Sequence, residues 1–350
     1  MTDNKRYLWF DFENAPHVLI LSPIIRHFQD KGYECILTAR NFSCTVGLCK
    51  TMGYNAQVVG KSGTAKTKLG KSVMVLKRSG GLYRKLWRKP FSMAMSHGSR
   101  SQALAAHTMK MPVISMDDYE HSYQGFTHFA DYILVPFPIN PEIWGKQANK
   151  VIHYPGLKEE LYLQDFTPDK YYLHKEVGEN LINNNDILVL LRPSGRWSHY
   201  RSEKSVEVQR SIMELMAQNE NVFMILIPRD KEQKQEMAEF CQERNIRYYI
   251  PKNVLNGPQL IWNMDMVISG GGTMTREAAV LGVPSYSFFG GKPGAVDNYL
   301  EEEGKLISIR EPAEIDKIKL EKRHYKDFKL EPKALDFVIA FVQEVINNHA

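Results

Sequence analysis

The sequence predicts an α/β protein with two doubly wound domains, each built on a parallel sheet. Three observations lead to this prediction. Apolar segments of strand length alternate with longer segments of helical periodicity along most of the chain. Asp186–Leu191 is continuously apolar after its first residue, which is typical of a strand buried on both faces of a parallel sheet. A length of 350 residues is ordinary for two domains.

The first half of the chain begins with a strand, a turn and a helix. Tyr7–Phe12 is an aromatic-rich strand, Pro16 marks a turn, and apolar periodicity predicts a helix over His17–Lys31. Gly32 lies where a helix usually ends, and Tyr33–Thr38 follows as the next strand. The remaining elements of this half are expected at Phe91–Met95, Gln102–Ala106, Pro112–Ser115 and Tyr132–Val135.

The second half repeats this plan with a different sequence. Its strands are expected at Asp186–Leu191, Asn221–Ile227, Tyr248–Ile250 and Met266–Ser269, with helices around Ile212–Met216, Met237–Glu243 and Leu260–Asn263. We expect a first domain over residues 1–155, a second over 156–332, and an amphipathic helix in 333–350 that packs across their junction. Because doubly wound domains bind ligands at the carboxyl ends of their strands, the expected site is a cleft between the two domains.

Composition narrows the class of protein. Hydrophobic residues make up 43% of the chain and charged residues 24%, an ordinary globular mixture. No segment approaches the roughly 20 apolar residues of a membrane span, and an acidic residue follows the N-terminus too early for a signal peptide. The four cysteines have no paired spacing, which argues against zinc and disulfides. We therefore expect a cytoplasmic protein with reduced thiols.

Positive charge is concentrated in one segment. Ten basic residues and no acidic residue lie between Gly60 and Lys89, so that the rest of a chain with net charge +5 carries −5. We expect a loop over residues 60–71 and a basic amphipathic helix over 72–89, weakened by Gly80 and Gly81. Lys and Arg mixed with Trp and Leu are typical of a helix that binds an anionic membrane surface. An ordinary surface helix with its apolar residues in the core is the alternative; no known nucleic-acid-binding module accompanies the charge, so no nucleic acid is expected.

The segment SGGGTMTREAAVLGVPSY, residues 269–286, has the composition of an anion site. It is not a dinucleotide fingerprint, because Thr275 occupies the place of the third glycine, and the Gly-Lys-Ser sequences at Gly60 and Gly70 lack the first glycine of a P-loop. A strand, three glycines and a helix start bring backbone N–H groups and a helix dipole to one point. Glu277 follows one to two turns later, where its carboxylate could accept two ribose hydroxyls. A tight turn without a ligand is the alternative.

The whole chain resembles domain-of-unknown-function family 354. The resemblance lies in WFDFENAPHVLILSPII, SHGSRSQALAA, PVISMDDYEHS, YPGLKEELYL and GGGTMTREAAVLGVPSYSFFGG. Residues 269–298 also resemble the donor site of GT-B glycosyltransferases and of the related non-hydrolysing UDP-N-acetylglucosamine 2-epimerases. The resemblance implies the GT-B fold, in which two Rossmann-like domains face each other across a cleft.

The resemblance also implies a UDP-sugar site in the second domain. It assigns the phosphates to Arg192, Ser194, Gly195, Gly270, Gly271, Gly272 and Thr273, the ribose to Glu277, the uracil ring to the backbone of Val254 and Leu255, and the donor sugar to Lys292, Asp297 and Asn298. From the residues alone, Arg192 could instead form a salt bridge, and Asp297 and Asn298 could cap loops.

The epimerases provide a test within the sequence. They follow a His-Gly pair with a catalytic Asp and place a Glu after the next strand, whereas here Ser99 follows His97-Gly98 and Asp117-Asp118 replaces the Glu. Leu191 also takes the place of a His that they carry before their Arg pair. Because removal of a proton from carbon needs positioned acids and bases, these losses argue against 2-epimerisation.

A glycosyltransferase of this fold class needs no metal, only contacts to the diphosphate and a base for the acceptor hydroxyl. His17 is the candidate base, oriented by Asp11 and Glu13; its alternative role is to begin its own helix. The candidate acceptor-side residues are His97, Ser99, Asp117, Asp118, Glu120 and His121, whose spacing matches no standard metal site.

The sequence thus predicts a metal-independent transferase of polysaccharide or cell-envelope synthesis, without a cofactor, whose donor is a nucleotide-sugar and whose acceptor is a saccharide or a lipid-linked sugar. Its expected location is the cytoplasm, at the inner face of the membrane if the basic segment binds lipid. The alternatives are a UDP-sugar 2-epimerase and a nucleotide-sugar-binding protein without catalysis.

Overall fold

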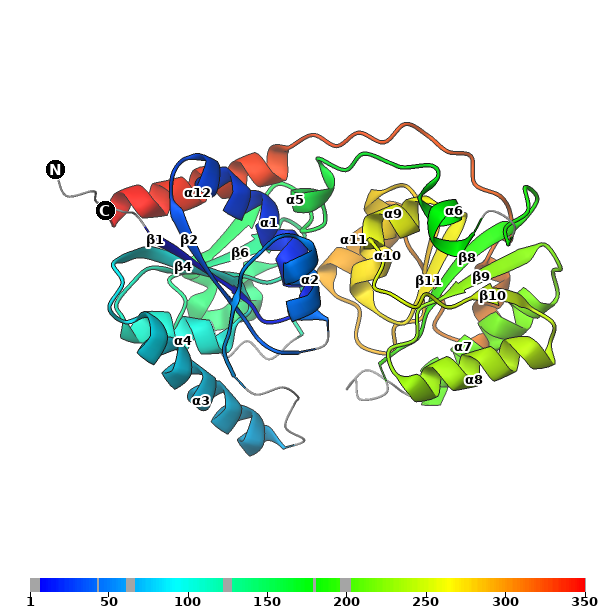
Figure 1. Ribbon diagram of the computed structural model, residues 1–350, viewed down its shortest axis with the longest axis horizontal. Helices are drawn as coiled ribbons and strands as arrows, with labels where there is room; N and C mark the ends of the chain where they lie inside the picture. The colour runs from blue at the N-terminus through cyan, green and yellow to red at the C-terminus, as the bar shows by residue number, and fades with distance from the viewer. Residues whose placement is uncertain are drawn as a thin grey trace. The chain divides into compact units, whose positions relative to one another are not determined.

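The computed structural model describes residues 7–42, 44–60, 67–121, 128–178, 181–195 and 203–349. Contacts divide the chain into two compact units (Figure 1). Unit 1 comprises Met1–Gln164 and Glu331–Ala350, and unit 2 comprises Asp165–Leu330. In the described part of the chain, no helix has both the length and the apolarity needed to cross a bilayer.

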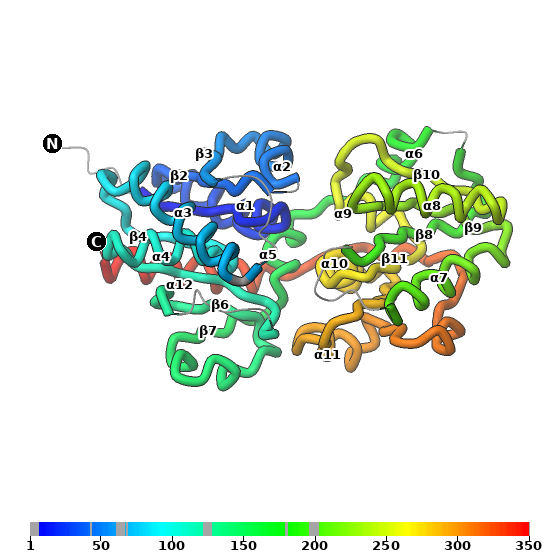
Figure 2. The backbone as a smooth tube through the Cα atoms, turned by 90° about the horizontal axis from the view of Figure 1, so that it is seen from below, coloured from blue at the N-terminus to red at the C-terminus, as the bar shows by residue number. Residues whose placement is uncertain are grey.

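Unit 1 contains a seven-stranded parallel sheet in the order β3-β2-β1-β4-β5-β6-β7. In Figure 2, β3 and β2 lie at one side of this sheet and β7 at the other. The strands are β1 (Tyr7–Phe12), β2 (Glu34–Ala39), β3 (Gln57–Val58), β4 (Phe91–His97), β5 (Val113–Met116), β6 (Tyr132–Pro136) and β7 (Val151–Tyr154). The helices are α1 (Ala15–Asp30), α2 (Thr45–Thr51), α3 (Lys68–Leu86), α4 (Arg100–Thr108), the 3-10 helix η1 (Pro141–Lys150), α5 (Glu160–Leu163) and α12 (Lys333–Asn348).

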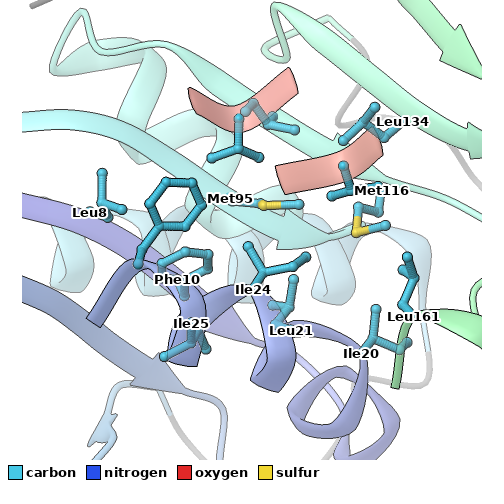
Figure 3. Close-up of a cluster of buried hydrophobic side chains, with 14 of the residues drawn as sticks. Leu8, Phe10, Ile20, Leu21, Ile24, Ile25, Met95, Met116, Leu134 and Leu161 are labelled. Carbon is cyan, nitrogen blue, oxygen red and sulfur yellow. The ribbon is translucent and has the colours of Figure 1, made fainter. Parts of the chain in front are cut away.

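The core of unit 1 lies between the sheet and helices α1 and α12. Leu21 and Ile24 of α1 lie near Phe10 of β1 and Met95 of β4, and Ile20 lies near Leu161 of α5 (Figure 3). The buried face of α12, which includes Val338, Val342 and Ile346, belongs to the same cluster. We expected this last helix at the junction of two domains; its apolar face is instead part of the unit 1 core.

Unit 2 contains a six-stranded parallel sheet in the order β10-β9-β8-β11-β12-β13. The strands are β8 (Ile187–Arg192), β9 (Val222–Leu226), β10 (Arg247–Tyr249), β11 (Met266–Ser269), β12 (Ser285–Ser287) and β13 (Ile307–Ser308). The helices are α6 (Tyr172–Val177), α7 (Glu203–Ala217), α8 (Lys231–Glu243), α9 (Gly257–Trp262), α10 (Gly272–Val280), α11 (Ala295–Glu302) and the 3-10 helix η2 (Pro312–Lys317).

The predicted α/β fold with two parallel sheets is confirmed. In each unit, successive strands are added first on one side of the first strand and then on the other. This change of order occurs between β1 and β4 in unit 1 and between β8 and β11 in unit 2. Such a switch point is where doubly wound sheets bind ligands, beyond the carboxyl ends of the strands. The site residues considered below come from these ends.

The basic segment differs from its prediction at its start. The helix begins at Lys68 rather than Ser72, because Thr67 caps it: the Thr67 hydroxyl accepts a hydrogen bond of 3.1 Å from the Gly70 amide. Lys61 and Lys66 of the expected loop lie outside the described residues. Gly81 stays helical and lets α3 approach Val59, whose side chain would lie 3.2 Å from a Cβ at this position.

Candidate functional site

In unit 2 the loop after β8 contacts the glycine turn after β11. The Gly270 amide donates to the Arg192 carbonyl at 3.0 Å, and the Ser194 hydroxyl donates to the Gly270 carbonyl at 3.2 Å. A Cβ at Gly270 would lie 2.1 Å from the Ser194 oxygen and 2.7 Å from the Phe288 ring. The first glycine is therefore required because two loops approach closely, and not because of an unusual backbone angle.

The next residues form the N-terminus of α10. Gly271 is the N-cap residue and offers no side chain to the free amides of the first turn. Gly271, Gly272 and Thr273 are only half-buried, so that these amides can be reached from solvent. The amides and the positive end of the helix dipole favour an anion at this point.

Two arginines flank this helix start. Arg192 ends β8, and Arg229 follows β9, with its Nη2 2.8 Å from the Cβ position of Gly271. Arg229 Nε donates to the Pro193 carbonyl at 2.9 Å, and this part-buried hydrogen bond fixes the guanidinium, while other parts of the residue reach solvent. Burial and then the charge of Arg192 lower the pKa of Arg229 to about 10. The two like charges repel each other, and an anion between them would relieve that repulsion.

Arg229, and Gln233 that holds it in place, were not predicted from the sequence. Gln233 Oε1 accepts from the Arg229 amide at 3.0 Å, and its Nε2 donates to the Ser194 carbonyl at 2.7 Å. One signal was available, since Arg229 follows the buried strand β9 within three residues and Arg192 ends the buried strand β8.

Glu277, the predicted ribose ligand, is buried in α10. Its Oε2 lies 3.9 Å from the Cβ position of Gly257, where α9 begins. Val254 and Leu255, which we expected beside the uracil ring, precede that helix; Val254 is exposed and Leu255 is half-buried. The structure thus places the predicted ribose ligand and the start of α9 close together.

Asp297, a predicted ligand of the donor sugar, is bonded through its carboxylate to a neighbouring arginine. Asp297 makes two hydrogen bonds to the Arg276 guanidinium, of 2.7 and 2.9 Å, and accepts a third from the Gly294 amide at the start of α11. The Asp297 carboxylate pairs with Arg276 because this arginine is almost completely buried and needs a counter-charge. Arg276 in turn lies 3.7 Å from the Cβ position of Gly272. The predicted sugar ligands Lys292 and Asn298 are exposed.

In unit 1, Asp11 and Glu13, which we expected to orient His17, both contact Arg78. The buried Asp11 carboxylate makes two hydrogen bonds to Arg78, of 2.7 and 2.9 Å, and Glu13 lies 3.1 Å from the same guanidinium. Glu13 also forms an ion pair with Arg40. Arg78 draws both carboxylates away from His17 because a buried guanidinium requires counter-charges.

Ser99 also serves this network rather than an acceptor. Its hydroxyl donates to Asp11 at 2.6 Å and accepts from the Gln102 amide at 3.3 Å as the N-cap of α4. Because Ser99 is completely buried, this hydroxyl is structural.

A second cluster surrounds His17 at the ends of β4 and β5. The His17 and His97 rings lie 4.8 Å apart, His97 Nε2 is 3.2 Å from Asp118 Oδ1, and Asp118 also pairs with Lys158. All four side chains are at least nine-tenths buried. Three of these residues were predicted for the site, His17 as the base and His97 and Asp118 on the acceptor side, but Lys158, which lies between β7 and α5, was not.

The electrostatics of this cluster favour an uncharged His17. Burial lowers the pKa of His17 well below the ordinary 6.5, the charges of His97 and Lys158 lower it further, and Asp118 acts in the opposite direction. Within the described residues, His17 Nδ1 has no hydrogen-bond partner. A neutral imidazole with an unused ring nitrogen can accept a proton.

The carboxyl group of Asp117 is the second group of this cluster whose pKa is shifted. Burial raises the pKa of its carboxyl group to about 6, with a contribution of the same sign from Asp118 and an opposing one from His97. Its Oδ1 accepts hydrogen bonds from the amides of Asp118 and Tyr119. Glu120 and His121, the remaining acceptor-side candidates, lie 3.6 Å apart, with Glu120 buried and His121 exposed. In the described part of the chain, no group of three or more His, Cys, Asp or Glu is placed to hold a metal ion.

Comparison with known proteins places this site in a family. Residues 7–348 match the family described as "Protein of unknown function (DUF354)", which confirms the resemblance in the sequence. The chain is 26% identical over 317 residues to the uncharacterized protein MJ0665 of Methanocaldococcus jannaschii, a match covering 88% of this chain and 89% of that protein.

Solved structures share the fold at low identity. One is the UDP-GlcNAc 2-epimerase of Neisseria meningitidis bound to UDP-GlcNAc, with a TM-score of 0.72, 13% identity and coverage of 98% of this chain and 100% of the other. The UDP-N-acetylglucosamine 2-epimerase of Rickettsia bellii matches with a TM-score of 0.68 and 15% identity, over 99% of this chain and 97% of the other. Anabaena Alr3699/HepE in complex with UDP and glucose matches with a TM-score of 0.55 and 13% identity, over 98% of this chain and 93% of the other. These likenesses confirm the fold of GT-B and epimerase proteins.

Proposed function

The chain belongs to the DUF354 family, and we propose that it binds a UDP-sugar in unit 2 and transfers the sugar to a saccharide or lipid-linked acceptor. The names of proteins with the same fold support the donor: the Neisseria epimerase structure contains UDP-GlcNAc, and the Anabaena structure contains UDP and glucose. The residues of unit 2 support binding of the diphosphate, and those of unit 1 support a role in accepting the proton of the acceptor hydroxyl.

The arrangement of Arg192, Arg229 and the Gly270–Thr273 turn carries the proposal. Two guanidinium groups whose charges repel each other flank a helix start with uncapped amides. A diphosphate would place negative charge between the two guanidinium groups and accept hydrogen bonds from both kinds of donor. The same contacts stabilise the diphosphate as a leaving group, for which the transfer then needs no metal.

Glu277 and Arg276 extend the site along α10. Glu277 is proposed to accept the ribose hydroxyls, because it lies one to two turns beyond the phosphate turn and beside the start of α9. The Arg276 guanidinium lies near Gly272, and Asp297 balances its charge and orients it. Asp297 then affects the donor through Arg276 rather than by contact with the sugar.

His17 is proposed as the base that accepts the proton of the acceptor hydroxyl. Its burial keeps the imidazole neutral around pH 7, and Nδ1 has no partner among the described residues. As the proton arrives, the adjacent Asp118 carboxylate stabilises the imidazolium, since its charge raises the pKa of His17. A positioned base of this kind contributes about 10²- to 10⁴-fold to a rate.

A 2-epimerase is the second candidate, and Asp117 is the observation that favours it. A buried carboxyl group with a pKa of about 6 beside His97 and Asp118 gives one cluster both acids and bases. Epimerisation requires both a base that removes the proton from carbon and an acid that returns a proton to it. Transfer needs only one base, which His17 provides.

Three measurements separate these functions. Thermal-shift screening with UDP, GDP, CMP and their sugars tests the donor: stabilisation by UDP compounds is expected, and stabilisation by none, or unchanged affinity in Glu277→Ala, would contradict the site. Release of UDP from a UDP-sugar in the presence of acceptor indicates transfer. Deuterium appearing at C2 of the sugar in D₂O indicates epimerisation. If the protein binds UDP but catalyses neither reaction, it is a binding protein.

The base is tested by His17→Gln, with His27→Gln as the matched control, since His27 is a second histidine of α1. We expect His17→Gln to lower the transfer rate by at least 100-fold while leaving UDP affinity unchanged, because His17 belongs to unit 1. The His27→Gln control should keep its rate. Full activity of His17→Gln would remove His17 as the base.

A further inference from the structure

Helix α3 carries an exposed apolar stripe that the proposed activity does not use. Leu69, Val73, Leu76, Tyr83 and Trp87 are all exposed, and Leu69 and Leu76 are 77% and 61% accessible. With Gly80 they are separated alternately by four and three residues, so that they fall on one line along the helix. In an ordinary surface helix this line would be polar.

The stripe points away from unit 1. Arg78 follows Leu69 by about two and a half helical turns and therefore faces the opposite side. On that side it is bound to Asp11 and to the Val59 carbonyl, and Leu82 and Leu86 are completely buried. The helix is thus fixed to the unit by its buried face, beside α4 (Figure 1). Rotation of α3 to bury the stripe would break the Arg78 ion pairs.

Cations accompany the stripe. Lys77, Arg84 and Arg88 are exposed and lie within about 100° of the stripe on one flank. The Arg88 guanidinium lies over the Trp87 ring, 4.8 Å from its centre. No acidic residue occurs from Gly60 to Lys89. The surface that faces this helix must therefore be apolar at its centre and negative around it.

An anionic lipid surface meets both requirements. A second copy of α3 would match the apolar line but would bring Lys77 and Arg84 against cations of its own kind, which opposes association. Nucleic acid would match the cations but would leave Leu69, Val73 and Leu76 without a suitable partner. We infer that α3 is an interfacial helix that docks unit 1 onto a membrane containing anionic phospholipid. Its exposed apolar side chains enter the interface, and its cations bind the headgroups.

Vesicle co-sedimentation of the full chain tests this inference. Vesicles of phosphatidylcholine that contain about 25% phosphatidylglycerol, an anionic lipid, are compared with vesicles of pure phosphatidylcholine at low and high salt. The wild-type chain should sediment with the anionic vesicles at low salt and much less with the neutral ones. Replacing Lys77, Arg84 and Arg88 by Gln should lower the partition coefficient by on the order of 100-fold.

Apolar contact is tested by the pair Leu76→Asn and Trp87→Ser, with Val206→Ser as the matched control, since Val206 is an exposed apolar residue on α7 of unit 2. The pair should lose most of the binding, and the control should keep it. Equal binding to both vesicle types, or no binding by the wild type, would overturn the inference. So would a dimer in sedimentation equilibrium that the Leu76/Trp87 pair dissociates, because a second copy would then cover the stripe. Stabilisation by UDP in the absence of vesicles is measured separately and does not depend on α3.

Discussion

Loss of the Arg229 guanidinium should weaken binding of a diphosphate much more than binding of a nucleoside. The expectation follows from its position, since Nη2 lies 2.8 Å from the Cβ position of Gly271 and Nε is held by the Pro193 carbonyl. A hydrogen bond to a charged group contributes about 1.5–3 kcal/mol, or roughly 10- to 100-fold in affinity. Arg229→Gln also relieves the repulsion of Arg192, which acts in the opposite direction. We therefore expect UDP affinity to fall by about 10- to 30-fold.

Isothermal titration of the full chain with UDP and with uridine measures this effect. Arg229→Gln should lose affinity for UDP and keep its affinity for uridine, because the guanidinium lies at the phosphate end of the site. Arg310→Gln is the matched control: Arg310 is a surface arginine of unit 2 paired with Glu301. The reasoning is refuted if UDP and uridine lose affinity equally, or if the control behaves as Arg229→Gln does.

Three further expectations concern stability. Gly270→Ala should lower the free energy of unfolding by about 1–3 kcal/mol in urea titrations, because a Cβ there would lie 2.1 Å from a side-chain oxygen, whereas Gly272→Ala, with 3.7 Å to the nearest atom, should be close to neutral. Arg78→Met should cost about 3–5 kcal/mol by leaving Asp11 buried without a counter-charge, and Asp11→Asn in the same chain should recover part of that loss in thermal denaturation. Asp117→Asn should gain stability relative to the wild type as pH rises from 5 to 8, by on the order of 1 kcal/mol, since a carboxyl whose folded pKa is raised to about 6 destabilises the folded state once it ionises. An Asp117→Asn difference that does not change with pH would show that the carboxyl titrates normally.

The sequence alone was sufficient for the fold and for the glycine turn, because both depend on short-range patterns. Strand and helix periodicities determine the alternation, and Gly32 ends α1 with a positive φ of 83°, as its position predicted. The glycine turn follows from local sequence, since a strand, glycines and a helix start are consecutive, but its close approach to Ser194, 76 residues earlier in the chain, does not. Val151–Tyr154 was missed as a strand because a four-residue edge strand has too little periodicity to identify.

The partners of each charged side chain could not be predicted in this way. Arg78 lies in a segment of ten basic residues, where composition favours exposure, yet it is buried against Asp11, 67 residues earlier in the chain. Only the sheet order, which places the ends of β1 and β4 side by side and α3 next to them, brings the two together. The sequence could count the cations of α3, but it could not show which one anchors the helix and which face the outside.

His17 shows why nearness in sequence misleads at a strand end. Asp11 and Glu13 precede it by six and four residues, yet their carboxylates turn to Arg78. The groups that do set its pKa come from three other segments: His97 at the end of β4, Asp118 after β5, and Lys158 after β7. Parallel strands deliver their carboxyl ends to one edge of the sheet, so residues 80 to 141 positions apart meet there while neighbours diverge. A candidate base in a doubly wound domain should therefore be sought among the residues that follow adjacent strands, and not among those that flank it in the chain.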